Sequence, residues 1–260
     1  MLSKIEPSNI QSMAYMDSQG SRDRARLFAV GEAARLAGTS TINARRWLEG
    51  YSYKRKGEVR RSDRKLGADV QREHRDLYCS FLDVLELRTA AALRTAGIRW
   101  NEIRDAAALM RQSWNAEYPF AVENLKTDGT AVFALLVERI RSGSSVSKEG
   151  PSKKLLQISR NQFAFEAIIG PALLDVVDFD SQHHPTRLWP LGRAERVFVD
   201  PSIRFGQPVV ADGGVPVEVL VQAYTANDND AAQVAKMYEV TTQTVHAAVD
   251  FGRRFWKKAA

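Results

Sequence analysis

Arginine and lysine side chains dominate the segment from Val30 to Lys65, which reads VGEAARLAGTSTINARRWLEGYSYKRKGEVRRSDRK. Their guanidinium and ammonium groups suit the binding of phosphates rather than covalent catalysis, because neutralising each phosphate of a nucleic acid releases condensed counterions. Asn43, Arg45 and Arg46 also carry side chains that can form paired hydrogen bonds to adenine or guanine. The segment therefore predicts recognition of a polyanion, with double-stranded DNA as the favoured class.

The positive charge of the chain is concentrated in this region. Residues 22–75 contain 15 Lys or Arg and 7 Asp or Glu, a net charge of +8, whereas the whole chain carries +6. A solvated basic surface is the commonest origin of such a run. Because the run from Lys54 to Lys65, which includes Arg60 and Arg61, directly follows a helix-turn-helix pattern, we favour DNA binding.

Side chains that support catalysis or bind metals are sparse. The single cysteine, Cys79, cannot form a thiolate pair and lies among apolar residues, where a buried thiol is expected. Glycine-rich phosphate loops and nucleophile motifs are absent from the sequence. One group has the composition of a metal site, although a solvated helix end is a commoner origin for it: Asp175, Asp178, Asp180, His183 and His184. We expect no enzyme activity, no cofactor and no metal.

Two short helices joined by a tight turn would position the basic residues. The first helix begins at Val30, Gly38 supplies the turn, and Ser40 caps a second helix that runs from Thr41 to about Gly50. We expect the apolar residues of the second helix to face the core: Ile42, Trp47 and Leu48. Its polar residues would face outward, towards a major groove: Thr41, Asn43, Arg45 and Arg46.

Further helices and a small sheet are predicted beyond the basic run. Apolar spacing predicts a helix from Leu77 to Ala96, which Gly97 ends, and a second from Trp100 to about Gln112. Asp128-Gly129 is a strong hairpin signal within 124–159, and Lys154 to Ser159 is a candidate third strand. A buried helix is expected over 163–177, kinked or broken at Gly170-Pro171.

The last segment repeats the helix-turn-helix pattern with less charge. A strand is predicted from Arg196 to Val199 and a helix from Val217 to Tyr224. The helices that follow, 230–238 and about 242–255, are joined by a turn with Thr241 or Thr242 as cap. Because the final helix offers Gln, Thr and His where the first motif offers arginines, we favour packing or partner binding for this motif. Basic residues near the end of the chain leave contact with DNA open.

These elements predict a mainly α fold with a small β hairpin or sheet, an α+β class. We expect a disordered arm at 1–26, a helix-turn-helix domain at 27–118, a connecting α+β region at 119–190 and a second helix-turn-helix domain at 191–260. Apolar runs are too short for a membrane helix and the N-terminus lacks the core of a signal peptide, so a cytoplasmic location is expected.

Two passages also resemble known families. FAVGEAARLAGTSTINARRWLEGYSYKRKG, followed by SFLDVLELRTAAALRTAGIRWNEIRDAA, resembles a MerR-like winged helix-turn-helix with its following helix pair. VFVDPSIRFGQPVVADGGVPVEVLVQAY, followed by DNDAAQVAKMYEVTTQTVHAAVDF, resembles the bacterial domain of unknown function 433. Their combination is similar to a VapB-type antitoxin of the subgroup that carries both domains.

The resemblance implies a homodimeric antitoxin that represses its own operon and neutralises a PIN-like ribonuclease toxin. It implies contacts with operator DNA through the second helix and the residues beyond it: Ser40, Thr41, Asn43, Arg45, Arg46, Tyr51, Tyr53, Lys54, Arg55 and Lys56. In the C-terminal domain, Asp212-Gly213-Gly214 stands where the family usually has Gly-Thr-Arg. A stand-alone transcription regulator with a C-terminal sensor or oligomerisation module is the alternative, and it shares the DNA prediction.

Overall fold

A computed structural model describes residues 27–66, 70–114, 116–121 and 169–257 of the chain. The structure is about half helical and has small antiparallel sheets, an α+β arrangement. Within the part of the chain described, no helix has the length and apolar character needed to cross a membrane. The N-terminal arm, the Asp128-Gly129 hairpin and the strand expected at 154–159 lie outside the described residues.

The two helices predicted from Val30 onward are confirmed. Helix α2 spans Val30–Ala37 and helix α3 spans Thr41–Glu49. Gly38 ends α2 in the left-handed conformation, at a φ of 72°, and its N–H bonds back to the carbonyls of the last turn. The hydroxyl of Ser40 caps α3 by accepting the N–H of Asn43 at 3.2 Å. Gly38 and the Ser40 cap therefore set the direction of α3 relative to α2.

The orientation predicted for Ile42 is wrong. Ala44, Trp47 and Leu48 form the buried side of α3, whereas Ile42 is 64% exposed. At about 100° per residue, Ile42 lies about 200° around the helix from Ala44 and so points away from the core. The buried side of α3 is already filled by Trp47, whose ring meets Trp100 edge-on at 4.8 Å between centroids.

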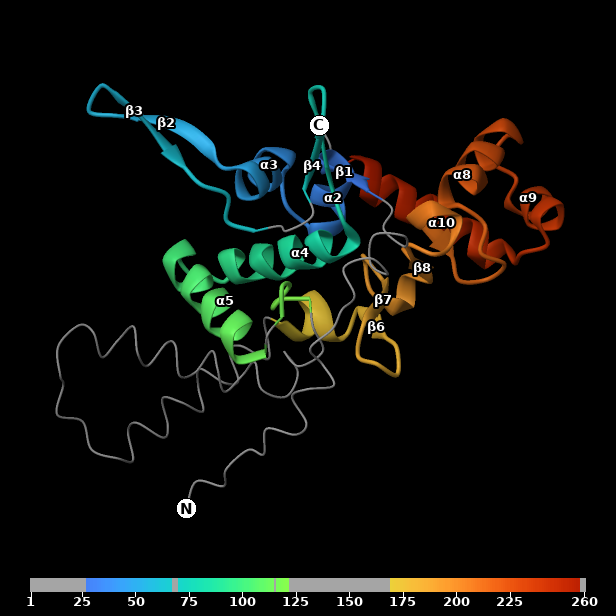
Figure 1. Cartoon of the computed structure of the whole chain (residues 1–260). Coiled ribbons are helices and arrows are strands. Elements are labelled where there is room, and N and C mark those ends of the chain that lie inside the picture. The colour runs from blue at the N-terminus through green and yellow to red at the C-terminus, as the bar shows by residue number, and fades with distance from the viewer. Residues whose placement is uncertain (1–26, 67–69, 115, 122–168, 258–260) are drawn as a thin grey trace, which may run out of the picture.

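A two-stranded ribbon follows α3. Strands β2 (Tyr51–Arg55) and β3 (Glu58–Ser62) pair antiparallel, with Tyr53 opposite Arg60 and Lys54 opposite Val59. Lys56 and Gly57 form the turn, and both have positive φ, 52° and 84°, as a two-residue hairpin turn of this hand requires. Figure 1 shows this β2–β3 hairpin extending away from the helices.

The predicted helix start at Leu77 is wrong, because Leu77 belongs to a second sheet that comes before the helix. Strands β1 (Phe28–Ala29), β4 (Gln71–Glu73) and β5 (Asp76–Cys79) form an antiparallel sheet in the order β1-β5-β4. Leu77 and Cys79 are buried at alternate positions of β5. Helix α4 spans Phe81–Thr95 and starts only after Ser80, which forms a capping box with Asp83. The apolar pattern alone did not separate the strand from the helix.

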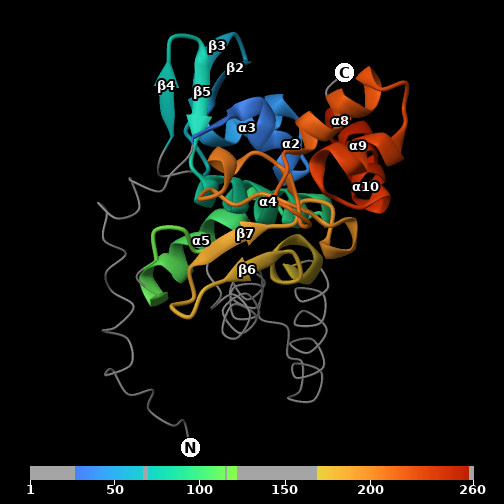
Figure 2. The same ribbon diagram turned by 90° about the vertical axis from the view of Figure 1, so that its right-hand side faces the viewer.

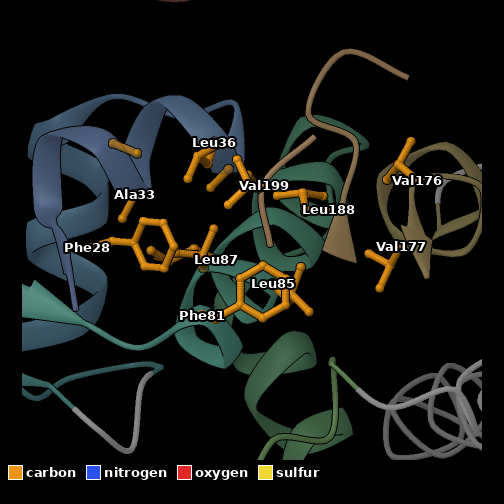
Figure 3. Packing of buried hydrophobic residues seen from close by; sticks show 14 of the residues in the cluster. Phe28, Ala33, Leu36, Phe81, Leu85, Leu87, Val176, Val177, Leu188 and Val199 are labelled. Atoms are coloured by element: carbon orange, nitrogen blue, oxygen red, sulfur yellow. The ribbon is translucent and has the colours of Figure 1, made fainter. Parts of the chain in front are cut away.

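Helix α4 is the centre of the fold. It packs against α2 on one side and against the π-helical turn Gly170–Leu174 on another. Helix α5 (Trp100–Trp114) follows after Gly97 and also contacts α4. Figure 3 shows buried side chains of one hydrophobic cluster around α4, including Leu36 of α2, Leu87 of α4, and Leu188 and Val199 from later segments of the chain.

Of the helix expected over 163–177, residues 163–168 lie outside the described residues, and the described part is not a regular α-helix. Within the described residues, one π-helical turn at Gly170–Leu174 replaces its last turns, and Val177 instead begins strand β6 (Val177–Phe179). Pro171 has no N–H for a regular helical bond, which explains the irregular turn. Strand β7 (Pro185–Leu188) pairs with β6, and Leu188 then bridges Val199.

The C-terminal elements match the predicted order. Strands β8 (Val197–Phe198) and β9 (Val209–Val210) pair antiparallel, with the short helical turns Arg193–Glu195 and Arg204–Gly206 before and between them. The helices are α8 (Val217–Ala226), α9 (Ala231–Tyr238) and α10 (Thr242–Lys257). Helix α10 packs on both α8 and α9. Thr241 caps it by accepting the N–H of Thr244 at 3.1 Å.

Candidate nucleic-acid interface

The outward side of α3 is polar and accessible. Thr41, Asn43 and Arg46 are exposed, and Arg45 is half-buried at the edge of this side. Ser40, at the cap, is also exposed although its hydroxyl is bonded to the N–H of Asn43. The predicted α3 residues therefore lie together on one surface. Both β ribbons, β2–β3 and β4–β5, extend from the side of the molecule that carries α3 (Figures 1 and 2).

Arg45 is held by neighbouring groups. Its guanidinium lies 3.6 Å from the carboxylate of Glu49, one turn along α3, and 3.5 Å from the carbonyl oxygen of Arg75. Arg72 on β4 also forms an ion pair with Glu49. Glu49 therefore gathers two arginines from different elements, which orients them but neutralises part of their charge.

Arg46 connects α3 to the hairpin. Its guanidinium lies over the ring of Tyr51, 5.2 Å from the centroid, and the ring of Tyr51 lies 5.8 Å from that of Tyr53. A cation over an aromatic face gains electrostatic energy while its N–H groups stay available at the edge. In the described part of the chain, no carboxylate pairs with Arg46, so its hydrogen-bonding fork is free for a ligand.

The register of the β2–β3 hairpin divides its side chains between two surfaces. Opposite residues of an antiparallel pair share a face, so Tyr53 and Arg60 lie on one face and Lys54 and Val59 on the other. Arg61 joins the second face, together with Ser52, while Arg55 shares the first face with Glu58. Arg60 is paired with Glu58 at 3.3 Å. The two faces therefore differ: one carries tyrosines and paired charges, the other Lys54 and Arg61 with an exposed valine.

Both faces of the hairpin and its turn carry cations that have no ion-pair partner among the described residues. Among the residues that the structure describes, no carboxylate lies within ion-pair distance of Lys54, Arg55, Lys56 or Arg61. A groove of about 540 Å³ lies where the hairpin leaves α3. Arginines from three segments line it, together with Glu49: Arg61, Arg64 and Arg72. Three arginines and one glutamate therefore make this junction a basic recess.

Sequence reasoning identified most of this surface but missed Arg72. The cations of the second helix and of the basic run were predicted because they lie close together in sequence. Arg72 instead reaches the surface through β4, a strand that was not predicted. The turn at 74–75 was the signal that could have predicted β4, because short strands often flank a two-residue turn.

Asp178, in the middle of the acidic group, forms ion pairs with arginines. Asp178 accepts Arg193 at 2.6 Å and the indole N–H of Trp189 at 3.0 Å, and Arg187 lies 3.8 Å away. Asp180 accepts the backbone N–H groups of its own turn, including that of His184. Within the described residues, no cluster of three His, Cys, Asp or Glu side chains has a geometry that holds a metal ion.

Asp212 ties the glycine-rich loop to the last helix. Its carboxylate accepts the hydroxyl of Thr244 at 2.8 Å and pairs with Arg196. The hydrogen bond from Thr244 and the charge of Arg196 hold the pKa of Asp212 below its usual value. Gly213 and Gly214 both have positive φ and shape the turn. The acidic residue therefore has a structural role in placing α10.

Comparison with known proteins matches the C-terminal segment to a family. Residues 197–251 match the family described as protein of unknown function DUF433. No curated protein matches the chain. Among solved structures, the chain is similar to Rv2018 from Mycobacterium tuberculosis, with a TM-score of 0.60 and 19% sequence identity; the match covers 86% of this chain and 97% of that one. At this identity the similarity establishes the shared fold alone.

Proposed function

We propose that this protein binds double-stranded DNA through α3 and the β2–β3 hairpin. The observation that carries the proposal is the arrangement of α3: its apolar side is buried, its polar side is exposed, and a basic ribbon stands beside it. A helix presented in this way fits the major groove, while a flanking ribbon can contact the adjacent phosphates or minor groove, as in a winged helix-turn-helix.

The proposed contacts divide by their chemistry. Arg46 has a free guanidinium edge for the two acceptors of guanine, and Asn43 has the amide that pairs with adenine. The exposed cations of the hairpin suit phosphates, which fix position rather than sequence. The DNA-contacting set is the one that the sequence predicted: Ser40, Thr41, Asn43, Arg45, Arg46, Tyr51, Tyr53, Lys54, Arg55, Lys56, Arg60 and Arg61.

We further propose that the protein is the antitoxin of a type II toxin-antitoxin module. A homodimer would place two α3 helices on a palindromic operator, and the second half of the chain would cover a PIN-like ribonuclease. The C-terminal match to DUF433 supports this proposal, because the resemblance to VapB-type antitoxins rests on that domain beside a helix-turn-helix. A transcription regulator with a C-terminal sensor would keep the DNA contacts and lack the toxin.

The DNA-binding proposal is tested with the full chain and the DNA upstream of its own reading frame. A mobility-shift titration is expected to give a specific complex that weakens steeply as salt is raised. An unrelated duplex of equal length is the control. Equal affinity for both duplexes would contradict sequence-specific binding.

The antitoxin proposal is tested by co-expression. The chain is produced with a small PIN-like protein encoded beside it, and we expect the two proteins to co-purify and growth arrest to be relieved. Arg46→Ala serves as a matched variant, because it impairs the proposed DNA surface and should leave toxin neutralisation intact. If the chain binds DNA but neither captures nor neutralises such a neighbour, the regulator function replaces the antitoxin.

A further inference from the structure

Ile42 is an exposed apolar side chain in the middle of a polar surface. It is the second residue of α3 and is 64% exposed. It precedes Arg46 by four residues, so the two side chains lie one above the other on the outward side of the helix. Thr41 and Asn43, its neighbours in sequence, are also exposed. Ile42 therefore stands among the residues proposed to reach base edges.

A DNA groove offers one apolar group that can cover such a side chain. Most base edges in the major groove present hydrogen-bond donors and acceptors, but thymine presents its C5-methyl group. The first residues of a recognition helix are the ones that reach the bases. An isoleucine at this position cannot donate or accept a hydrogen bond, so it gains affinity only where it meets an apolar surface.

We propose that Ile42 is a specificity residue that contacts a thymine methyl group in the bound DNA. The inference rests on the proposed DNA-binding function. It names thymine as a base that α3 selects, beside the guanine proposed for Arg46. A protein partner fits this position less well, because Ile42 is the one apolar side chain among the exposed residues of α3. The adjacent exposed residues of α3 are polar, whereas protein interfaces have an apolar core of several residues.

The experiment uses a duplex that the full chain itself selects from a random-sequence library. Each thymine of that duplex is then replaced in turn by deoxyuridine, which lacks only the methyl group. With the wild-type chain, we expect about fourfold weaker binding at one thymine of each half-site, which is the value of one buried methyl group. With Ile42→Ala, the thymine and deoxyuridine duplexes should bind equally.

Two further variants separate this contact from other causes. Ile42→Leu keeps an apolar side chain and should retain most of the preference for thymine. Met237→Ala removes an exposed apolar residue of α9, 57% exposed and outside the proposed DNA surface, and should leave that preference unchanged. Circular dichroism of each variant checks that the helices are retained, as expected for changes at exposed positions.

The possible outcomes distinguish the two proposals. If the library yields no enriched sequence, the proposed DNA-binding function is wrong, and so is the proposed role of Ile42. If a sequence is enriched but wild type and Ile42→Ala respond equally to deoxyuridine, DNA binding stands and the thymine contact is overturned. Loss of self-association in Ile42→Ala, with the thymine preference intact, would overturn it in favour of a protein contact.

Discussion

Arg46 and Lys54 illustrate two kinds of cation on the proposed DNA surface. Arg46 is oriented by the ring of Tyr51, so its planar fork has a defined direction. Lys54 lies on an exposed hairpin face and acts as a flexible point charge. Orientation suits the reading of a base, and a flexible charge suits a phosphate.

Replacing these two residues should therefore have different effects. Arg46→Ala is expected to lower discrimination at one base pair by about 1 to 3 kcal/mol. Lys54→Ala should weaken all duplexes alike and reduce the slope of log affinity against log salt by about one. Fluorescence-anisotropy titrations over a range of salt concentrations measure both quantities. Lys236→Ala, which removes an exposed cation from α9, is the control, and an equal loss of slope there would contradict the assignment.

Glu86 is a second residue whose environment determines its behaviour. Its side chain is 1% exposed, and it accepts the backbone N–H of Phe120 at 2.8 Å. Burial raises its pKa to about 7, although the hydrogen bond from Phe120 and the charge of Arg111 oppose the shift. The folded protein thus retains this proton to a higher pH than the unfolded chain.

This raised pKa predicts a loss of stability as pH rises. Between the ordinary glutamate pKa and about 7, the folded state binds more protons than the unfolded state, so the free energy of unfolding falls with pH in that window. Glu86→Gln should remove on the order of 3 kcal/mol of this pH dependence. Urea unfolding at pH 5 and pH 8 measures it. Glu218→Gln, at an exposed site on α8, is the control; parallel pH profiles for Glu86→Gln and wild type would contradict the prediction.

At the scale of elements, Gly50 sets the junction between α3 and the β2–β3 hairpin. Its φ is 81°, and a Cβ at this position would lie 2.2 Å from the carbonyl oxygen of Ser62. Backbone atoms of β3 and the following loop cannot move aside without moving the strand. The close approach therefore fixes the hairpin relative to α3, and with it the spacing of the two parts of the proposed interface.

Gly50→Ala should displace the hairpin and weaken DNA binding. We expect a stability loss of about 1 to 3 kcal/mol from the left-handed backbone and the contact with β3. Gly57→Ala is the matched control, because its φ is 84° but no atom lies within 4 Å of the added Cβ. Urea unfolding and DNA titration of both variants provide the test. Equal loss of DNA affinity in the two variants would show that the junction contact does not position the hairpin.

At the scale of the whole molecule, Arg88 joins parts of the chain that are distant in sequence. From α4 it donates to the carbonyl of Leu36 in the last turn of α2 at 2.8 Å and to that of Ala172 in the π-helical turn at 2.6 Å. Burial lowers its pKa to about 10. The C-terminal helix also reaches α2, where Arg35 lies 5.6 Å from the ring centroid of Phe255. Helix α2 is therefore braced by later segments.

Arg88→Met should loosen these distant segments together. The change leaves two carbonyl groups without their donor, and we expect about 3 kcal/mol lower stability. Hydrogen exchange should increase in both α2 and the π-helical turn. Arg94→Met is the control on the same helix, because the contacts that the structure shows for Arg94 are with nearby residues, the carbonyl of Ile98 and the ring of Trp100. Increased exchange confined to α4 would contradict a bracing role for Arg88.

Local features of the sequence determined helices α2 and α3. Gly38, the Ser40 cap and the buried spacing of Trp47 and Leu48 act within one or two turns, so the sequence predicted α2 and α3 closely. Local patterns also predicted α8, α9 and α10. They misplaced the start of α4, because Leu77 and Cys79 fit both a helix face and a strand whose partner, β1, lies almost 50 residues earlier.

The sequence by itself also determined that the chain carries its cations beside an exposed polar helix. Only the tertiary structure decided which of these cations are paired and how their side chains are oriented. Glu49 holds Arg45 and Arg72, Tyr51 orients Arg46, and the hairpin register separates Tyr53 from Lys54. Ile42 turned outward because Trp47 and Leu48 fill the inner side of α3. These outcomes depend on contacts between elements, which no local pattern of residue types contains.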